Sequence, residues 1–280
     1  MKEELVQRTL GDIGAVVVSH SNWLQQLAFD NQNLRQELLD LKAMLATLNN
    51  IDLDLYSVQT EFPIAIDSND HIVPWGTQND NTRSSLFVRA CERLFPEKPV
   101  RFLDLGCSGG GIVFDFLMRG HKAFGLEGSD FSLRSGRANW SVIPRSLATC
   151  DISRPFKIIA NDLSEAVFDV ITLWEVFEHI PEERLDTLMS NIKSHLAEGG
   201  YVFASIALED DVVDGVSYHP TVKPESWWIE YFASKGLSFS KYDFLSYSEH
   251  CRGIGNGPLD PVYADRPEAG FHCTLRLITK

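Results

Sequence analysis

A glycine-rich turn at residues 106–111 is the feature that most constrains the fold of this chain. The preceding residues, Val100 to Leu105, read as an apolar strand, and the sequence continues Gly-Cys-Ser-Gly-Gly-Gly into a helix-like segment, 111–119. Glycine permits positive φ angles and, because it has no Cβ atom, lets a ligand approach the backbone closely. In an α/β sheet such a turn lies at the carboxyl end of a strand, where these folds bind ligands. The sequence therefore predicts an α/β fold with a ligand site at this turn.

The spacing within the turn separates two classes of nucleotide ligand. A dinucleotide fingerprint has glycine at the first, third and sixth positions. Counted from Gly106, the third position is Ser108 and the sixth is Gly111, so that match is imperfect. The run Asp-Leu-Gly-Cys-Ser-Gly-Gly instead resembles the first motif of class I S-adenosylmethionine (SAM)-dependent methyltransferases. In that motif an acid, here Asp104, stands two residues before the first glycine, and Ser108 takes the place of the usual second glycine.

Four further segments follow in the order that this resemblance implies. A second apolar strand, 123–126, is closed by an acid, and a third, near 147–150, leads into Asp-Ile. The run 168–181 looks like the fourth motif of the family, a strand followed by a loop. Residues 196–200 resemble the Leu-x-Pro-Gly-Gly turn before a fifth strand, with Glu198 in place of proline. The resemblance covers about residues 99–280 and implies a seven-stranded, mostly parallel, doubly wound sheet with an antiparallel last strand.

The same resemblance assigns roles to individual residues. Glu127 would hold the ribose hydroxyls of SAM, a role that its position about 20 residues beyond the glycine turn also favours. Asp104 would orient the turn. The adenine would lie between an acid and an apolar side chain, and two residues after the fourth strand would lie under the methionine portion. The full predicted cofactor-binding set is Asp104, Gly106, Cys107, Ser108, Gly110, Glu127, Gly128, Asp151, Ile152, Trp174 and Glu175. No compact metal-ligand spacing appears in the sequence, and no metal ligand is assigned.

Two histidines are the candidates for activating a methyl acceptor. Methyl transfer mainly requires alignment of acceptor, methyl group and sulfur, and a hydroxyl acceptor must also lose its proton, usually to a histidine or a carboxylate. His219 lies before a predicted helix, 223–235, and His179 directly follows the fourth strand. The alternative for the Glu178-His179 pair is structural, in that it caps the next helix and supports the cofactor loop.

Aromatic residues near His219 have two interpretations. Tyr218, Trp227 and Trp228 would form a wall that stacks on a ring or a sugar face, or the tryptophans would pack their helix against the sheet.

Two loops are candidates to close over the site. Residues 71–83 lie ahead of the core fold, where the family often places a cofactor lid, but the sequence favours a plain helix cap, with Asn81 or Thr82 capping a helix over 84–95. Residues 246–270 form a second long, glycine-containing loop. After it, apolar residues alternate with polar ones and predict a half-buried terminal strand that inserts antiparallel, with Phe271, Cys273, Leu275 and Leu277 on the apolar face.

Residues 17–48 carry a heptad pattern that predicts a parallel coiled coil. Leucine occupies four of the five d positions, and the repeat persists for more than four heptads. Asn31 is the polar a position, and opposite charges at Asp30 and Arg35 favour pairing of two copies. The sequence therefore predicts a homodimer; the alternative is that this amphipathic helix packs on its own domain. Residues 51–80 read as an irregular connector, which gives predicted boundaries of 1–50, 51–98 and 99–280.

Composition limits the partners and the compartment. The net charge of −14 argues against a nucleic-acid substrate, because such binding needs cationic contacts to phosphate. Five cysteines without C-x-x-C spacing favour reduced thiols in the cytoplasm, and no apolar stretch is long enough to span a membrane. The predicted reaction is methylation of a hydroxyl on a small molecule or saccharide. The alternatives are a nucleotide-dependent oxidoreductase or epimerase, and a dimeric scaffold that keeps the fold without turnover.

Overall fold

The structure, a computed structural model, describes residues 55–240, 245, 249–251 and 268–278, together with positions 23, 24, 27 and 31. The chain divides into two compact units, Met1–Ile51 and Asp52–Lys280. The second unit contains every strand described below.

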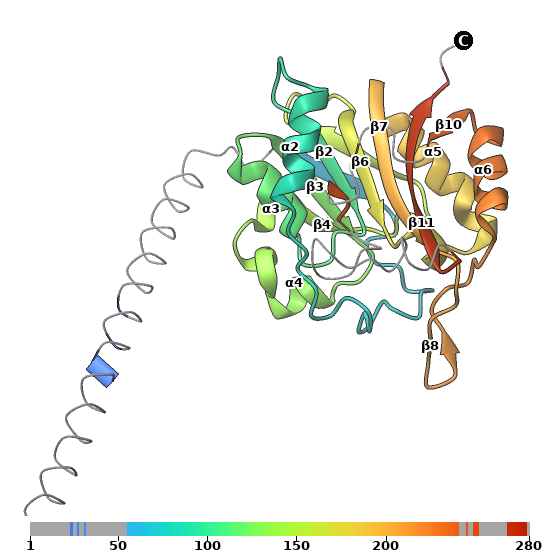
Figure 1. The fold of residues 1–280 in the computed structure, drawn as a ribbon, viewed down its shortest axis with the longest axis horizontal. Coiled ribbons are helices and arrows are strands. Elements are labelled where there is room, and N and C mark those ends of the chain that lie inside the picture. Colours follow the sequence, from blue (N-terminus) through green and yellow to red (C-terminus); the bar gives the residue numbers. More distant parts are fainter. Residues whose placement is uncertain are drawn as a thin grey trace, which may run out of the picture. The chain divides into compact units, whose positions relative to one another are not determined.

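A seven-stranded sheet organises the second unit (Figure 1). Its order is β10-β11-β7-β6-β2-β3-β4. The five strands from β7 to β4 run parallel, whereas β11 is antiparallel to both of its neighbours. The mostly parallel sheet with an antiparallel last strand is thereby confirmed. Its strands are β2 (Arg101–Leu105), β3 (Lys122–Glu127), β4 (Leu147–Thr149), β6 (Phe168–Trp174), β7 (Leu196–Ala207), β10 (Leu237–Ser240) and β11 (Gly270–Leu277).

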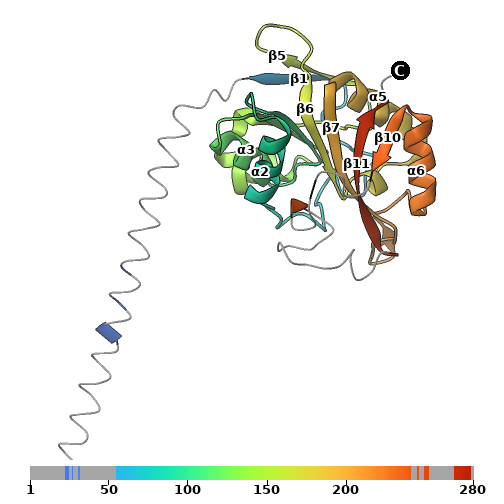
Figure 2. The same cartoon turned by 45° about the horizontal axis from the view of Figure 1, so that its top comes forward.

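Helices cover both faces of this sheet (Figure 2). On one side lie α2 (Ser85–Leu94) and α3 (Gly111–Met118), followed by the short α4 (Phe131–Ser135); on the other lie α5 (Leu185–His195) and α6 (Glu225–Ser234). Parallel strands buried on both faces are expected to be nearly continuously apolar, as β6 is. Short 3₁₀ helices complete the connections, at Ala138–Ser141, Pro144–Ser146, Phe177–His179 and Glu182–Arg184.

Aromatic side chains fill the core on each face. Phe102 of β2 stacks on Phe116 of α3 with ring centroids 3.9 Å apart. On the opposite face, Trp228 is fully buried and packs against Phe177. Packing is therefore the correct interpretation of Trp228, and neither it nor Trp227 forms a wall of the cavity described below.

The turn predicted at residues 196–200 is present as an irregularity in β7. Phe168 pairs with Leu196, but Val170 pairs with Tyr201, so four intervening residues of β7 stand opposite a single residue of β6. Gly199 has a φ of +74° there, a conformation that glycine adopts without strain.

Two pairs of strands lie outside the sequence prediction. The segment expected to be an irregular connector contains β1 (Tyr56–Thr60), which pairs antiparallel with β5 (Phe156–Ala160). Burial drives this pairing, because the Tyr56 ring packs 5.1 Å from that of Phe168. A hairpin of β8 (Val212–Val213) and β9 (Val216–Ser217) turns at Asp214 and Gly215, both with positive φ.

The prediction of a half-buried last strand is wrong. His272 and Thr274, expected to face solvent, are 0% and 2% exposed. Strand β11 lies inside the sheet between β7 and β10, so both of its faces are covered.

The predicted coiled coil over 17–48 lies almost entirely outside the described residues. The four positions that are described, Trp23, Leu24, Leu27 and Asn31, are helical. The prediction for residues 246–270 likewise falls mostly outside them, and the predicted domain boundaries stay predictions. Among the described helices, none combines the length and the apolar character needed to cross a membrane. All five cysteines are free thiols.

Asp169 joins the start of β6 to the start of β2. Its carboxylate accepts hydrogen bonds from Lys98 Nζ at 2.7 Å and from the Arg101 guanidinium at 2.6 Å, and it is 2% exposed. Burial alone would raise the pKa of Asp169, but the hydrogen bonds from Arg101 and Lys98 outweigh it and hold this pKa below its usual value.

We expect Asp169→Asn to lower the free energy of unfolding by about 1–3 kcal/mol at pH 7, because charge-assisted hydrogen bonds are lost. A depressed carboxylate pKa adds stability above the pKa of the unfolded chain, about 3.9, and that contribution disappears as the pH falls through the folded-state value. Urea denaturation at pH 7 and at pH 3 should therefore reveal a difference that shrinks on acidification. Glu198→Gln, at an exposed position, is the control; equal loss in both variants would contradict the assignment.

Candidate active site

A cavity of about 460 Å³ opens at the carboxyl ends of β2, β3, β4 and β6. Its volume lies within the range of small-molecule sites. Among the residues that the structure describes, one arginine, Arg184, lines the cavity, against eight carboxylates: Asp67, Asp70, Asp80, Asp104, Glu127, Asp151, Glu175 and Asp211. This charge distribution favours a cationic ligand.

The glycine-rich turn forms one wall of the cavity. Gly106 and Gly110 have φ angles of +81° and +77°. Ser108 also adopts a left-handed φ, +48°, so a serine here takes the conformation that glycine would adopt freely. Its carbonyl accepts a hydrogen bond from Trp140 Nε1 at 2.8 Å, and its amide donates to Glu127 at 2.7 Å. These contacts hold the serine in a strained conformation at the ligand site.

Glu127 lies at the end of β3 with both carboxylate oxygens engaged. Oε2 accepts the Ser108 amide, and Oε1 accepts the Ser129 amide at 3.3 Å. Burial raises the pKa of Glu127, although these amide hydrogen bonds act in the opposite direction. Its neighbour across the sheet, Asp104, is buried, and its Oδ1 accepts the Thr172 hydroxyl at 2.6 Å.

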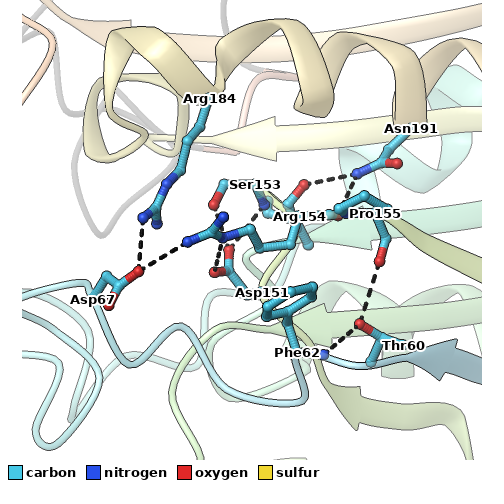
Figure 3. Close-up of polar contacts among 10 residues, drawn as sticks. Thr60, Phe62, Asp67, Asp151, Ser153, Arg154, Pro155, Arg184 and Asn191 are labelled. Carbon is cyan, nitrogen blue, oxygen red and sulfur yellow. Dashed lines mark hydrogen bonds and ion pairs between the residues drawn. The ribbon is translucent and has the colours of Figure 1, made fainter.

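The loop after β4 forms the opposite end of the cavity (Figure 3). Asp151 Oδ1 accepts hydrogen bonds from the Ser153 amide and hydroxyl at 3.0 and 2.6 Å. Asp67 lies between the guanidinium groups of Arg154 and Arg184, at 3.1 and 2.7 Å. This ion pair joins three segments that are distant in the sequence and fixes the walls on both sides of Asp151.

The residues that follow β6 lie against the cavity. Trp174 is buried, and its Nε1 donates to no described residue. Glu175 has a φ of +54°, and its amide donates to the carbonyl and hydroxyl oxygens of Ser205 on β7. A positive φ at a non-glycine residue is sustained only by such surroundings and marks functional segments.

The cavity brings together ten of the eleven predicted cofactor residues: Asp104, Gly106, Cys107, Ser108, Glu127, Gly128, Asp151, Ile152, Trp174 and Glu175. Gly110 is the exception, because it packs toward β4. A Cβ atom there would come within 2.7 Å of Leu147 Cδ1, so this glycine serves the packing of the turn and does not line the site.

Segment 74–82 closes one side of the cavity, and Arg137 attaches it to the turn. The Arg137 guanidinium donates to the carbonyl oxygens of Thr77 and Asp80, at 2.8 and 2.6 Å, and to Ser108 Oγ at 2.9 Å. The favoured interpretation of this segment, a plain helix cap supplied by Asn81 or Thr82, is wrong. The cap of α2 is Ser84, whose side chain accepts the Phe87 amide, not Asn81 or Thr82.

The two histidines predicted to activate the acceptor both line the cavity. His179 and His219 pack edge to face with ring centroids 4.6 Å apart. Thr221 joins the two loops that carry these histidines. Its backbone amide donates a hydrogen bond to the carbonyl oxygen of Glu178, and its hydroxyl donates one to the carbonyl oxygen of Ile180. Burial, and then His219, lower the pKa of His179 to about 4, so this imidazole is neutral near pH 7.

Glu178 does not line the cavity. One of its oxygens accepts the Ala207 amide at 2.9 Å, which ties the loop after β6 to the end of β7. Glu178 therefore supports the loop after β6, as one part of the structural alternative predicted, but it does not cap either of the helices that follow; His179 lines the cavity.

The site fits the cofactor that the resemblance implies. SAM carries positive charge on its sulfonium and ammonium groups, and the lining is dominated by carboxylates. Glu127 and Asp151 accept hydrogen bonds at the ends of adjacent strands, as receptors of ribose and adenine must.

Several lining or supporting residues were not found from the sequence, namely Arg137, Trp140, Asp67, Arg184 and Asp70. No spacing rule marks them, because each acts through a contact between distant segments. The β8–β9 hairpin that precedes His219 could have been predicted from the Asp214-Gly215 dipeptide, because Asp-Gly favours a tight turn between two strands.

Residues 80–252 match the family described as "Methyltransferase domain". A search of the curated proteins finds no match. The TehB-like SAM-dependent methyltransferase from Corynebacterium glutamicum is 15% identical, over 72% of this chain and 91% of that one, with a TM-score of 0.47. The CcbJ methyltransferase from Streptomyces caelestis is 13% identical, over 71% and 91%, with a TM-score of 0.47. The glycopeptide N-methyltransferase MtfA complexed with S-adenosylhomocysteine is 14% identical, over 71% and 92%, with a TM-score of 0.44.

We expect Arg137→Met to weaken SAM binding about 10-fold, equivalent to about 1.4 kcal/mol, because segment 74–82 loses its attachment to the turn. Isothermal titration calorimetry measures the affinity, and limited proteolysis should show faster cleavage within 74–82. Arg89→Met, on the exposed face of α2, is the matched control. Affinity and cleavage equal to those of the control would refute a positioning role for Arg137.

Proposed function

The chain belongs to the methyltransferase-domain family, and from that premise we propose that it transfers the methyl group of SAM to a hydroxyl of a small molecule or saccharide. Family membership confirms that the chain is a SAM-dependent methyltransferase with SAM as its cofactor. The observation that carries the site assignment is the Glu127 carboxylate, anchored by backbone amides at the end of β3 and lining the cavity.

We propose one role for each group of cofactor residues. Glu127 accepts hydrogen bonds from the ribose hydroxyls, and Asp151 with Ile152 holds the adenine. Asp104, with the turn residues Gly106 to Ser108, orients the cofactor, while Trp174 and Glu175 lie beside its methionine portion. The carboxylates that line this cavity stabilise the positive charge of the bound cofactor.

Methyl transfer forms an oxygen–carbon bond and breaks the carbon–sulfur bond of SAM, whose electron pair remains on sulfur. The hydroxyl proton must leave, and His219 and His179 are the proposed catalytic pair that activates the hydroxyl. Both side chains line the cavity and contact each other. A histidine within reach of the acceptor is the group most often used for proton removal.

The acidic cavity supports a neutral, hydroxyl-bearing acceptor. Eight carboxylates in the lining would repel a polyanion such as a nucleic acid. Tyr218 joins His219 at the acceptor end and provides an aromatic surface for a ring or a sugar face.

We expect Glu127→Ala to weaken SAM binding at least 100-fold, because two charge-assisted hydrogen bonds to the ribose are lost, each worth about 1.5–3 kcal/mol. Calorimetric titration with SAM, and with NAD as comparison ligand, measures this. Thermal melting checks that the variant folds, and Glu198→Ala is the control. Unchanged SAM affinity would contradict the ribose assignment, and tighter binding of NAD than of SAM would contradict the cofactor.

We also propose that the chain is a cytoplasmic homodimer, paired through residues 17–48. The heptad pattern supports this, because leucines at successive d positions form the narrow apolar seam along which two helices of a coiled coil pack.

We expect the double variant Leu34→Asp, Leu41→Asp to convert the dimer to a monomer, since charges at d positions would be buried in the seam. Light scattering after size-exclusion chromatography gives the mass. The matched control, Gln36→Asp with Ala43→Asp, adds the same charge at outward f positions and should remain dimeric. A wild-type chain that is monomeric at micromolar concentration would disprove the pairing.

A further inference from the structure

Three potential metal ligands converge at the acceptor end of the cavity. Glu178, His179 and His219 each offer a ligand atom, and these atoms all lie within 4.8 Å of one another. They come from two loops, one after β6 and one after the β8–β9 hairpin, which Thr221 fastens together. The sequence spacing did not reveal this cluster, because 40 residues separate His179 from His219.

A buried carboxylate oxygen in this cluster lacks a partner. Glu178 is 0% exposed, and while Oε1 accepts the Ala207 amide, Oε2 accepts no hydrogen bond from any described residue. Glu175 lies close enough to act on Glu178 as a like charge. A buried carboxylate beside a second acid is costly unless a cation or a proton compensates it.

The two imidazoles are oriented as metal ligands are. His219 Nδ1 lies 2.6 Å from the Glu209 carbonyl oxygen, so it carries the proton and leaves the Nε2 lone pair available. His179 Nδ1 lies 3.4 Å from the Asp70 carboxylate. Metal-bound histidines typically donate their second ring N–H to a carbonyl or a carboxylate, which fixes the ring orientation. His219 therefore has the outer contact typical of a metal ligand, while His179 is positioned by the nearby Asp70 carboxylate and by a hydrogen bond with the Tyr218 backbone.

We infer that Glu178, His179 and His219 bind a divalent first-row transition metal ion beside the methyl-transfer site. Two imidazoles and one carboxylate suit manganese, iron, cobalt, nickel or zinc, whereas magnesium and calcium prefer ligand sets made of oxygen alone. His179 and His219 line the cavity, so the remaining coordination positions of the ion face the acceptor.

This inference deepens the proposed function, because it specifies how the histidine pair activates the acceptor. A hydroxyl bound to a divalent ion loses its proton more readily than a free one, and the ion also positions the oxygen. The two histidines would then act as ligands of the ion, and the hydroxyl proton would pass to solvent water instead of to His219.

Metal binding is tested directly, without SAM or acceptor. Tag-free protein is stripped with a chelator, dialysed, and titrated with Co²⁺ while the visible absorption of the ion is followed. We expect one equivalent to bind with spectral changes that indicate nitrogen and oxygen ligands, and Mg²⁺ to compete weakly. His219→Ala should raise the dissociation constant for Co²⁺ at least 10-fold, as even losses of outer contacts at metal sites commonly do.

A control variant, a second ligand variant and a cofactor titration accompany this measurement. His121→Ala removes a histidine that does not line the cavity and should bind Co²⁺ as the wild type does. Glu178→Gln keeps an oxygen for the Ala207 amide and should also weaken binding. Each variant is also titrated with SAM in the presence of the chelator, which checks that it is folded and tests the cofactor site without metal. Loss of SAM binding would count against the proposed function, whereas loss of Co²⁺ binding alone concerns only the metal site. The metal site would be overturned if the wild type bound less than one equivalent of Co²⁺, or if His219→Ala bound Co²⁺ as tightly as the wild type. It would also be overturned by methyltransferase activity that persists in chelator but requires His219, because that result would indicate direct proton removal by this histidine.

Discussion

The hydrogen bond from the Ser108 amide to Glu127 couples the two strands on which the cofactor site depends. It requires Ser108 to hold a left-handed backbone conformation, which aims the amide across to the end of β3. Trp140 fixes the carbonyl of the same residue, and Arg137 fixes its hydroxyl. A serine therefore substitutes for glycine at this position because three neighbours compensate for its strain. The same arrangement preorganises the carboxylate, so binding costs little further ordering.

Parallel strands explain why so many acids meet in one cavity. Their carboxyl ends lie at one edge of the sheet, so an acid that ends one strand lies near the acids that end its neighbours. Asp104 and Glu127 lie at the ends of β2 and β3, Asp151 follows the adjacent β4, and all three share this edge. Like charges gathered in a partly buried site destabilise the empty protein and favour cations. A sulfonium cofactor at one end and a metal ion at the other would both relieve this repulsion.

The core sheet and most of the cofactor site follow from the sequence because their signals are local. Strand, turn and helix are contiguous at 100–119, and an acid directly after a strand must point to the ligand edge. The contacts that complete the site are not local. Arg137 reaches segment 74–82, and Asp67 meets Arg154 and Arg184, through folding that no periodicity encodes. The pairing of β1 with β5 and the burial of His272 depend equally on neighbours that are distant in the chain.

The proposed acceptor end depends on the β8–β9 hairpin more than on the strands of the sheet. Two residues just ahead of the hairpin hold His219 in place. The Glu209 carbonyl accepts a hydrogen bond from the His219 ring at Nδ1, and the Asp210 carboxylate accepts one from the His219 backbone amide. Thr221 then joins this loop to the residues after β6, which carry His179. The cofactor end is thus built on strand termini, while the acceptor end is built on loops. Loops tolerate change more readily than strands do, so the acceptor can vary among enzymes on this fold while the methyl donor stays the same.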